Sequence, residues 1–123
     1  MTRAGKTPGR IAFVGSGPGD AGLLTVRGRD VITSASLLVT DPDVPADIVG
    51  LAADGAEVRP AVGEPADVAK DLANEAATGR SVVRLVAGDP LTAEAVIREV
   101  QEVAKAGATF DVVPGVTAGA AVP

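Results

Sequence analysis

Residues 10–25 read RIAFVGSGPGDAGLLT, and this stretch decides the fold expected for the chain. Its first part, Ile11–Val14, is apolar without alternation, which is typical of a strand covered on both faces. The next part, Gly15–Asp20, carries glycine at every second position up to Gly19, so this loop can turn sharply and approach a ligand closely. The last part begins a helix, whose first turn offers free backbone N–H groups. The stretch therefore predicts a strand, a glycine loop and a helix in succession.

The glycine loop has two interpretations on its residues alone. A dinucleotide fingerprint requires Gly-x-Gly-x-x-Gly; Gly15 and Gly17 fit it, whereas Asp20 takes the third position. A carboxylate at the mouth of a helix repels pyrophosphate, so a phosphate cradle is disfavoured. Asp20 suits a ribose hydroxyl, an amino group or a cation, or else it caps the helix of a plain strand-to-helix turn. The residues leave the choice between a ligand site and a plain turn open.

Composition narrows the classes of function. The chain has 123 residues, enough for one domain, with no cysteine and no histidine. These absences exclude a disulfide framework, a Cys-based zinc site and His-dependent nucleophilic catalysis, and we expect no metal site. The net charge of −5 argues against nucleic-acid binding. No apolar run reaches the roughly 20 residues of a membrane span, and residues 1–9 read as a flexible tail, so we expect a cytoplasmic protein.

Apolar strand patterns alternate with helix patterns along the rest of the chain. This alternation predicts an α/β domain over residues 10–123, a five-stranded, mostly parallel sheet with helices on both faces. The expected strands are Ile11–Val14, Ser36–Thr40, Glu57–Arg59, Val82–Val86 and Phe110–Val113. The expected helices cover residues 22–35, 46–53 and 66–77, and a fourth helix, for whose first turn Pro90 is suited, runs to Ala106.

Four motifs in order resemble those of the tetrapyrrole (corrin/porphyrin) methylases. Gly15–Asp20, followed by Leu23-Leu24-Thr25 and Gly28, is similar to the family's first motif. Asp41 follows the second strand, Ala87–Pro90 resembles its Gly-Gly-Asp-Pro motif, and Pro114–Ala118 resembles its Pro-Gly-Ile-Thr/Ser motif. Within the family, the uroporphyrinogen-III C-methyltransferases are the most similar members.

This resemblance implies an S-adenosylmethionine-dependent methyltransferase with a tetrapyrrole substrate, uroporphyrinogen III, in sirohaem or cobalamin biosynthesis. Asp41 takes the position of the family's aspartate that is proposed to accept a proton. The expected cofactor-binding positions are Pro18, Gly88, Asp89, Thr92, Thr117 and Ala118 from the resemblance, with Gly17, Gly19 and Asp20 from the glycine loop.

Two departures from the family pattern support an alternative. The family's lysine, a proposed proton donor, is missing, since no lysine lies between Lys6 and Lys70, and Arg59 would be a poor proton donor. Leu91–Ala95 replaces the family's aromatic, glycine- and arginine-rich run. The alternative is a non-catalytic, degenerate methylase domain fused to uroporphyrinogen-III synthase.

The family's second domain would begin where this chain ends. We therefore expect further domains C-terminal to Pro123, and we expect residues 1–123 alone to fold without catalysing methyl transfer. The small apolar residues from Val116 to Val122 favour association into a homodimer.

Overall fold

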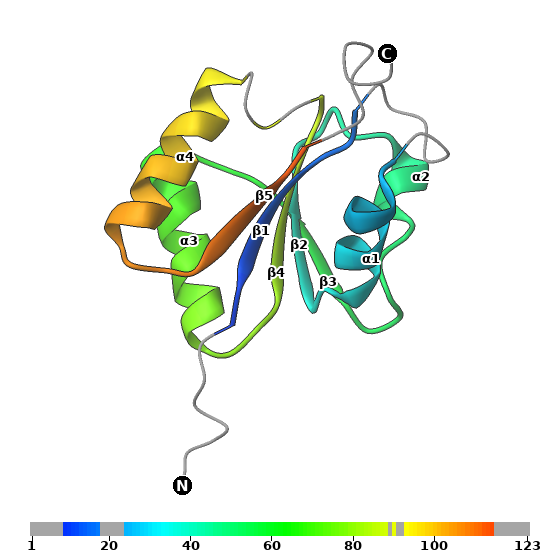
Figure 1. The fold of residues 1–123 in the computed structure, drawn as a ribbon, viewed down its shortest axis with the longest axis horizontal. Coiled ribbons are helices and arrows are strands. Elements are labelled where there is room, and N and C mark those ends of the chain that lie inside the picture. The colour runs from blue at the N-terminus through cyan, green and yellow to red at the C-terminus, as the bar shows by residue number, and fades with distance from the viewer. Residues whose placement is uncertain (1–8, 18–23, 89, 91–92, 115–123) are drawn as a thin grey trace, which may run out of the picture.

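The computed structural model describes residues 9–17, 24–88, 90 and 93–114. Its sheet has the strand order β3-β2-β4-β1-β5, and all four pairings between neighbouring strands are parallel. The expected α/β architecture is therefore confirmed (Figure 1). The elements are β1 (Ile11–Gly15), α1 (Val26–Ser34), β2 (Leu37–Thr40), α2 (Ala46–Val49), β3 (Glu57–Pro60), α3 (Pro65–Ala77), β4 (Val82–Val86), α4 (Glu94–Lys105) and β5 (Phe110–Val113).

Two apolar clusters lie on opposite faces of the sheet. Helices α3 and α4 cover one face, and α1 and α2 cover the other (Figure 1). Alternate residues of β1, β2, β4 and β5 contribute to the two clusters, because successive side chains of a strand point to opposite faces. In β1, for example, Phe13 packs with the α3 and α4 side and Val14 with the α1 and α2 side. The three central strands, β2, β4 and β1, are thus buried on both faces, as their apolar runs predicted, whereas the edge strand β3 is largely exposed.

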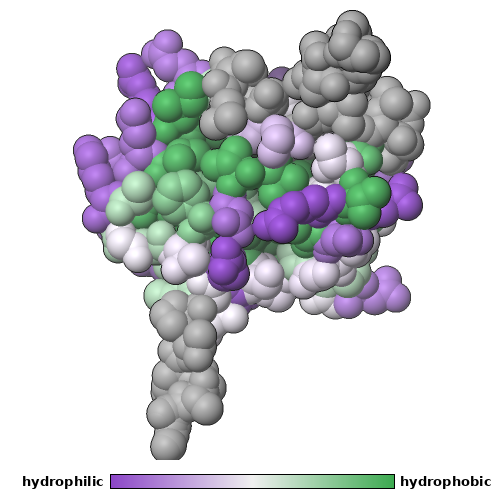
Figure 2. All heavy atoms as spheres, in the orientation of Figure 1, coloured by the Kyte–Doolittle hydropathy of each residue, from purple (hydrophilic) through white to green (hydrophobic). Residues whose placement is uncertain are grey.

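The two phenylalanines of the chain meet at the edge of the sheet. Their rings, Phe13 in β1 and Phe110 in β5, lie edge to face with centroids 6.2 Å apart. Residues 110–112 of β5 are only half-buried by the described residues. Figure 2 shows apolar side chains on this side of the molecule, interrupted by hydrophilic groups over the middle of the sheet.

The first two helices are shorter than expected. The sequence predicted a first helix from Gly22, but among the described residues α1 begins at Val26, because the Thr25 hydroxyl accepts a hydrogen bond from the Gly28 N–H and caps it. The second helix was expected to reach Ala53, but α2 ends at Val49 and the chain continues in tight turns. No helix among the described residues is long and apolar enough to cross a membrane.

Candidate functional site

The predicted site residues that the structure describes lie at the carboxyl ends of three neighbouring strands. Asp41 follows β2, Gly88 follows β4 with one residue between, and Gly17 follows β1 in the same way. These strands are adjacent in the order β2-β4-β1, so the three residues share one edge of the sheet. Ligands of open parallel sheets bind beyond this edge.

Gly17 and Gly88 form a backbone bridge across this edge. The Gly17 N–H donates a hydrogen bond of 3.0 Å to the Gly88 carbonyl. One residue earlier, the Ser16 N–H donates a hydrogen bond of 2.9 Å to the Val86 carbonyl. Both glycines have positive φ, 65° at Gly17 and 77° at Gly88, a conformation that other residues rarely adopt. A Cβ built on Gly88 meets no atom within 4 Å, so the space before its backbone is open. The bridge therefore offers a ligand half-buried main chain, with open space in front of Gly88.

Asp41 is held at the same edge by its main chain and its side chain. Its N–H donates to the Leu85 carbonyl at 3.0 Å and so extends the pairing of β2 with β4 by one residue. Its carboxylate oxygen Oδ1 accepts a hydrogen bond of 2.8 Å from the Arg84 guanidinium. Its side chain is 28% exposed, so Asp41 can meet a ligand while it remains anchored. Asp43, in contrast, lies exposed in the following turn.

Asp41 contacts a buried ion pair that the sequence analysis did not predict. Arg84 lies in the middle of β4 and donates from Nε and Nη2 to the two carboxylate oxygens of Glu99 in α4, at 2.7 and 3.0 Å. Both residues are only 3% exposed. The available signals were a charged residue inside an apolar strand run and a glutamate on the apolar stripe of a helix, between Val96 and Val103.

The electrostatics of this group follow from its burial. Burial raises the pKa of the Glu99 carboxyl, and the hydrogen bond and positive charge of Arg84 act in the opposite direction. Burial also works against the charge of Arg84, but the contacts with Glu99 and Asp41 outweigh it and raise the pKa of the guanidinium above its ordinary value. One cation therefore faces two carboxylates at this edge.

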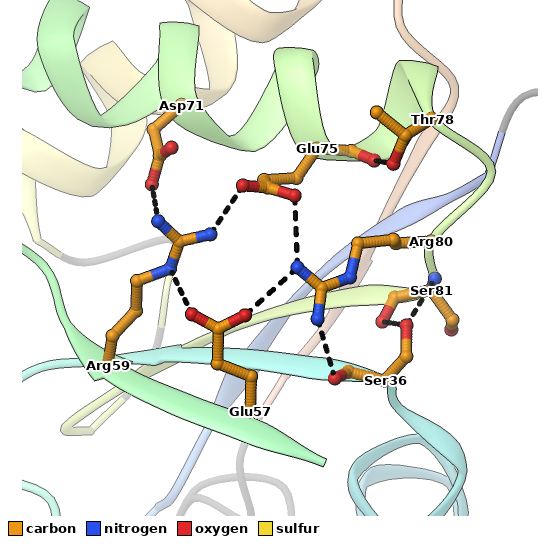
Figure 3. Close-up of polar contacts among 8 residues, drawn as sticks. All are labelled: Ser36, Glu57, Arg59, Asp71, Glu75, Thr78, Arg80 and Ser81. Atoms are coloured by element: carbon orange, nitrogen blue, oxygen red, sulfur yellow. Dashed lines mark hydrogen bonds and ion pairs between the residues drawn. The ribbon is translucent and has the colours of Figure 1, made fainter. Parts of the chain in front are cut away.

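Arg59 was the basic residue nearest to the position of the family's lysine, and the structure places it in a different ion cluster. Its guanidinium pairs with Glu57, Asp71 and Glu75, and Arg80 joins the same cluster through Glu57 and Glu75 (Figure 3). The hydrogen bond to Glu75, the largest effect, raises the pKa of Arg59 above its ordinary value. Arg59 is thus a structural cation between β3 and α3 that does not release its proton.

The same cluster predicts how stability changes in acid. Hydrogen bonds from Arg59 and then Arg80 lower the pKa of the Glu75 carboxyl in the folded protein. A carboxyl of this kind stabilises the fold above its unfolded-state pKa, about 4.3, and the contribution is lost as the pH falls through the lower folded-state value. We expect E75Q to lower the free energy of unfolding at pH 7 and to flatten its decline in acid.

Urea unfolding of E75Q and the unmodified protein at pH 7 and at several acid pH values measures this difference. The matched control is E94Q, which removes an exposed carboxylate whose ion pair among the described residues is with Arg98 at 3.3 Å, and it should have a small effect. Equal stability of E75Q and the unmodified protein at pH 7 would show that the cluster adds nothing to the fold.

The remaining predicted site residues lie outside the described part of the chain: Pro18, Gly19, Asp20, Asp89, Thr92, Thr117 and Ala118. Within the described ranges, no group of three acidic side chains is placed to hold a metal ion. A separate surface hollow of about 260 Å³ lies near the amino ends of β1 and β4. Its lining includes Arg10 and Arg27, which each pair with Asp111, and it is remote in the fold from the glycine bridge.

Comparisons with known proteins match this fold and its motifs. The sequence profile of the tetrapyrrole (corrin/porphyrin) methylases matches residues 10–123. Siroheme synthase 1 of Pectobacterium atrosepticum is 45% identical over 122 residues, which cover 93% of this chain and 25% of that protein. The chain thus spans about a quarter of the length of the curated relatives it matches.

Solved structures agree with the sequence comparisons. Uroporphyrin-III C-methyltransferase from Thermus thermophilus superimposes with a TM-score of 0.81 and 32% identity, covering 89% of this chain and 48% of that one. A second structure of the Thermus enzyme, complexed with S-adenosylhomocysteine, has a TM-score of 0.75 and 33% identity, covering 89% of this chain and 46% of that one. On the profile match and the shared fold, the chain belongs to the tetrapyrrole (corrin/porphyrin) methylase family.

Proposed function

We propose that residues 10–123 form the N-terminal domain of an S-adenosylmethionine-dependent C-methyltransferase that acts on uroporphyrinogen III, in sirohaem or cobalamin biosynthesis. The observation that carries the proposal is the bridge between Gly17 and Gly88, with open space before Gly88, at the ligand-binding edge of the sheet. Family membership and the S-adenosylhomocysteine complex of the Thermus relative support it.

The described residues fit such a cofactor. The absence of side chains at Gly17 and Gly88 lets a ligand approach the main chain closely. We propose that Pro18, Gly19, Asp20, Asp89, Thr92, Thr117 and Ala118 complete the binding site. When bound, the cofactor supplies a methyl group activated on a sulfonium sulfur, and this transfer needs no metal.

The role proposed for the protein is to orient the reactants and to accept a proton. Holding two reactants in line contributes roughly 7–11 kcal/mol to lowering a barrier, and the domain's rigid sheet edge is suited to it. Asp41 is proposed to accept the proton that the macrocycle loses from another of its atoms after methyl transfer, since the methylated ring carbon is fully substituted and has none to release; its carboxylate lies at the same edge and is partly exposed. We also propose that a second domain closes over this edge, that the protein is cytoplasmic and that it forms a homodimer.

Cofactor binding and methyl transfer by the whole protein test the proposal. Calorimetric titration should show binding of S-adenosylhomocysteine and none of NAD, which a dinucleotide site would bind. Mass spectrometry should show methyl groups added to uroporphyrinogen III. Absence of S-adenosylhomocysteine binding would overturn the proposal.

Binding without transfer to uroporphyrinogen III would favour the non-catalytic domain instead. The relatives described above are named as siroheme synthase and uroporphyrin-III C-methyltransferase. These names do not support a fusion to uroporphyrinogen-III synthase.

A further inference from the structure

The buried pair of Arg84 and Glu99 calls for an explanation beyond stability. Both side chains are 4% exposed and lie between β4 and α4. Desolvating two charges is costly, and replacing a buried ion pair with apolar residues of similar volume is often neutral or stabilising. The neighbours on this face, such as Val82 and Val86 of β4 and Val96 and Val103 of α4, form an apolar cluster that would accept such residues.

The hydrogen bonds of Arg84 fix its guanidinium in one orientation. Nε and Nη2 hold the two oxygens of Glu99, Nη1 donates to the Leu85 carbonyl at 3.1 Å, and Nη2 also donates to Oδ1 of Asp41. Every nitrogen of the fork therefore has a partner on a rigid element. A planar group held at all its nitrogens gives Asp41 a fixed point of attachment.

Glu99 also reduces the positive charge that acts on Asp41. Without it, the whole positive charge of Arg84 would act on Asp41 and hold its carboxylate as a tight ion pair. With Glu99 bound through both oxygens, the three groups together carry one negative charge. Among the described residues, no hydrogen bond is donated to Oδ2 of Asp41, which leaves this oxygen for a ligand.

We propose that Arg84, oriented and neutralised by Glu99, is a positioning residue that holds Oδ1 of Asp41 and thereby presents Oδ2 to the substrate. This inference rests on the proposed function, because it assigns the contact a role in the same proton transfer. It extends that function from Asp41 to the two buried residues behind it.

A double variant, R84M/E99L, separates positioning from stability. It replaces both buried charges with apolar side chains, so the fold should keep nearly its full free energy of unfolding in urea. Asp41 loses its anchor, and we expect kcat for methyl transfer to fall by about 100-fold, as for misplaced reacting groups, while the affinity for S-adenosylhomocysteine is unchanged. The control R98M/E94L removes an exposed pair of α4 and should leave kcat unchanged.

A second measurement does not depend on turnover. Three-bond NMR couplings of the Asp41 side chain should report one χ1 rotamer in the unmodified protein and averaged rotamers in R84M/E99L. In a D41N background the double variant should cause little further loss of kcat, because the two changes act on one group.

The possible outcomes distinguish the two proposals. Unchanged Asp41 couplings, or full kcat in a folded R84M/E99L, would overturn the positioning role. If the unmodified protein transfers no methyl group to uroporphyrinogen III, the proposed function fails, and the couplings alone decide whether Arg84 orients Asp41.

Discussion

Replacing Asp41 with asparagine is expected to lower kcat for methyl transfer by roughly 100- to 10,000-fold, the usual contribution of a general base. Asparagine keeps the shape of the side chain and can still accept the hydrogen bond from Arg84 at Oδ1. It cannot take up a proton at neutral pH. Because Arg84 remains neutralised by both oxygens of Glu99, D41N should fold like the unmodified protein.

Two measurements on the whole protein show whether the loss is chemical. The affinity for S-adenosylhomocysteine, from calorimetry, should change little, since the glycine bridge lies beyond the ends of β1 and β4 and does not involve the residues after β2. The control is D43N, two residues on, where an exposed aspartate lies in the turn. Equal kcat in D41N and the unmodified protein would mean that Asp41 ends β2 and has no role in catalysis.

The architecture could be predicted because each strand gives a local signal. Apolar runs such as Val82–Val86, separated by helix-length segments, favour a mostly parallel sheet with helices on both faces, and the carboxyl ends of parallel strands share an edge. This reasoning placed Gly17, Gly88 and Asp41 at one edge, where the structure has them. The predicted ends of the helices were less accurate. The start of α1, for example, depends on one side-chain hydrogen bond, the cap at Thr25.

The buried ion pair could not be predicted in the same way. Arg84 occurs in an apolar strand and Glu99 in an amphipathic helix, and nothing in the local sequence of either residue indicates that they pair with each other. They come together because α4 packs across β4, a contact set by side-chain packing over many residues. The helical pattern did contain the clue, since Glu99 falls on the stripe that Val96 and Val103 define.

Replacing Gly17 with valine is expected to abolish detectable binding of S-adenosylhomocysteine, a loss of roughly 100-fold or more, which corresponds to about 2.7 kcal/mol. At φ 65° a β-branched side chain is strained, and relief of this strain would break the hydrogen bond to the Gly88 carbonyl. The Cβ and its methyl groups would also cover the main chain that the ligand is proposed to contact.

The matched control separates backbone strain from loss of the site. Gly55 also has a positive φ, 87°, and a Cβ built there meets no atom within 4 Å, but it lies in the exposed turn before β3. We therefore expect G55V and G17V to lose similar amounts of stability in urea, while G55V keeps its affinity for S-adenosylhomocysteine. Equal affinity in G17V and the unmodified protein would mean that the bridge only shapes the chain, and the glycine loop would then be a plain strand-to-helix turn.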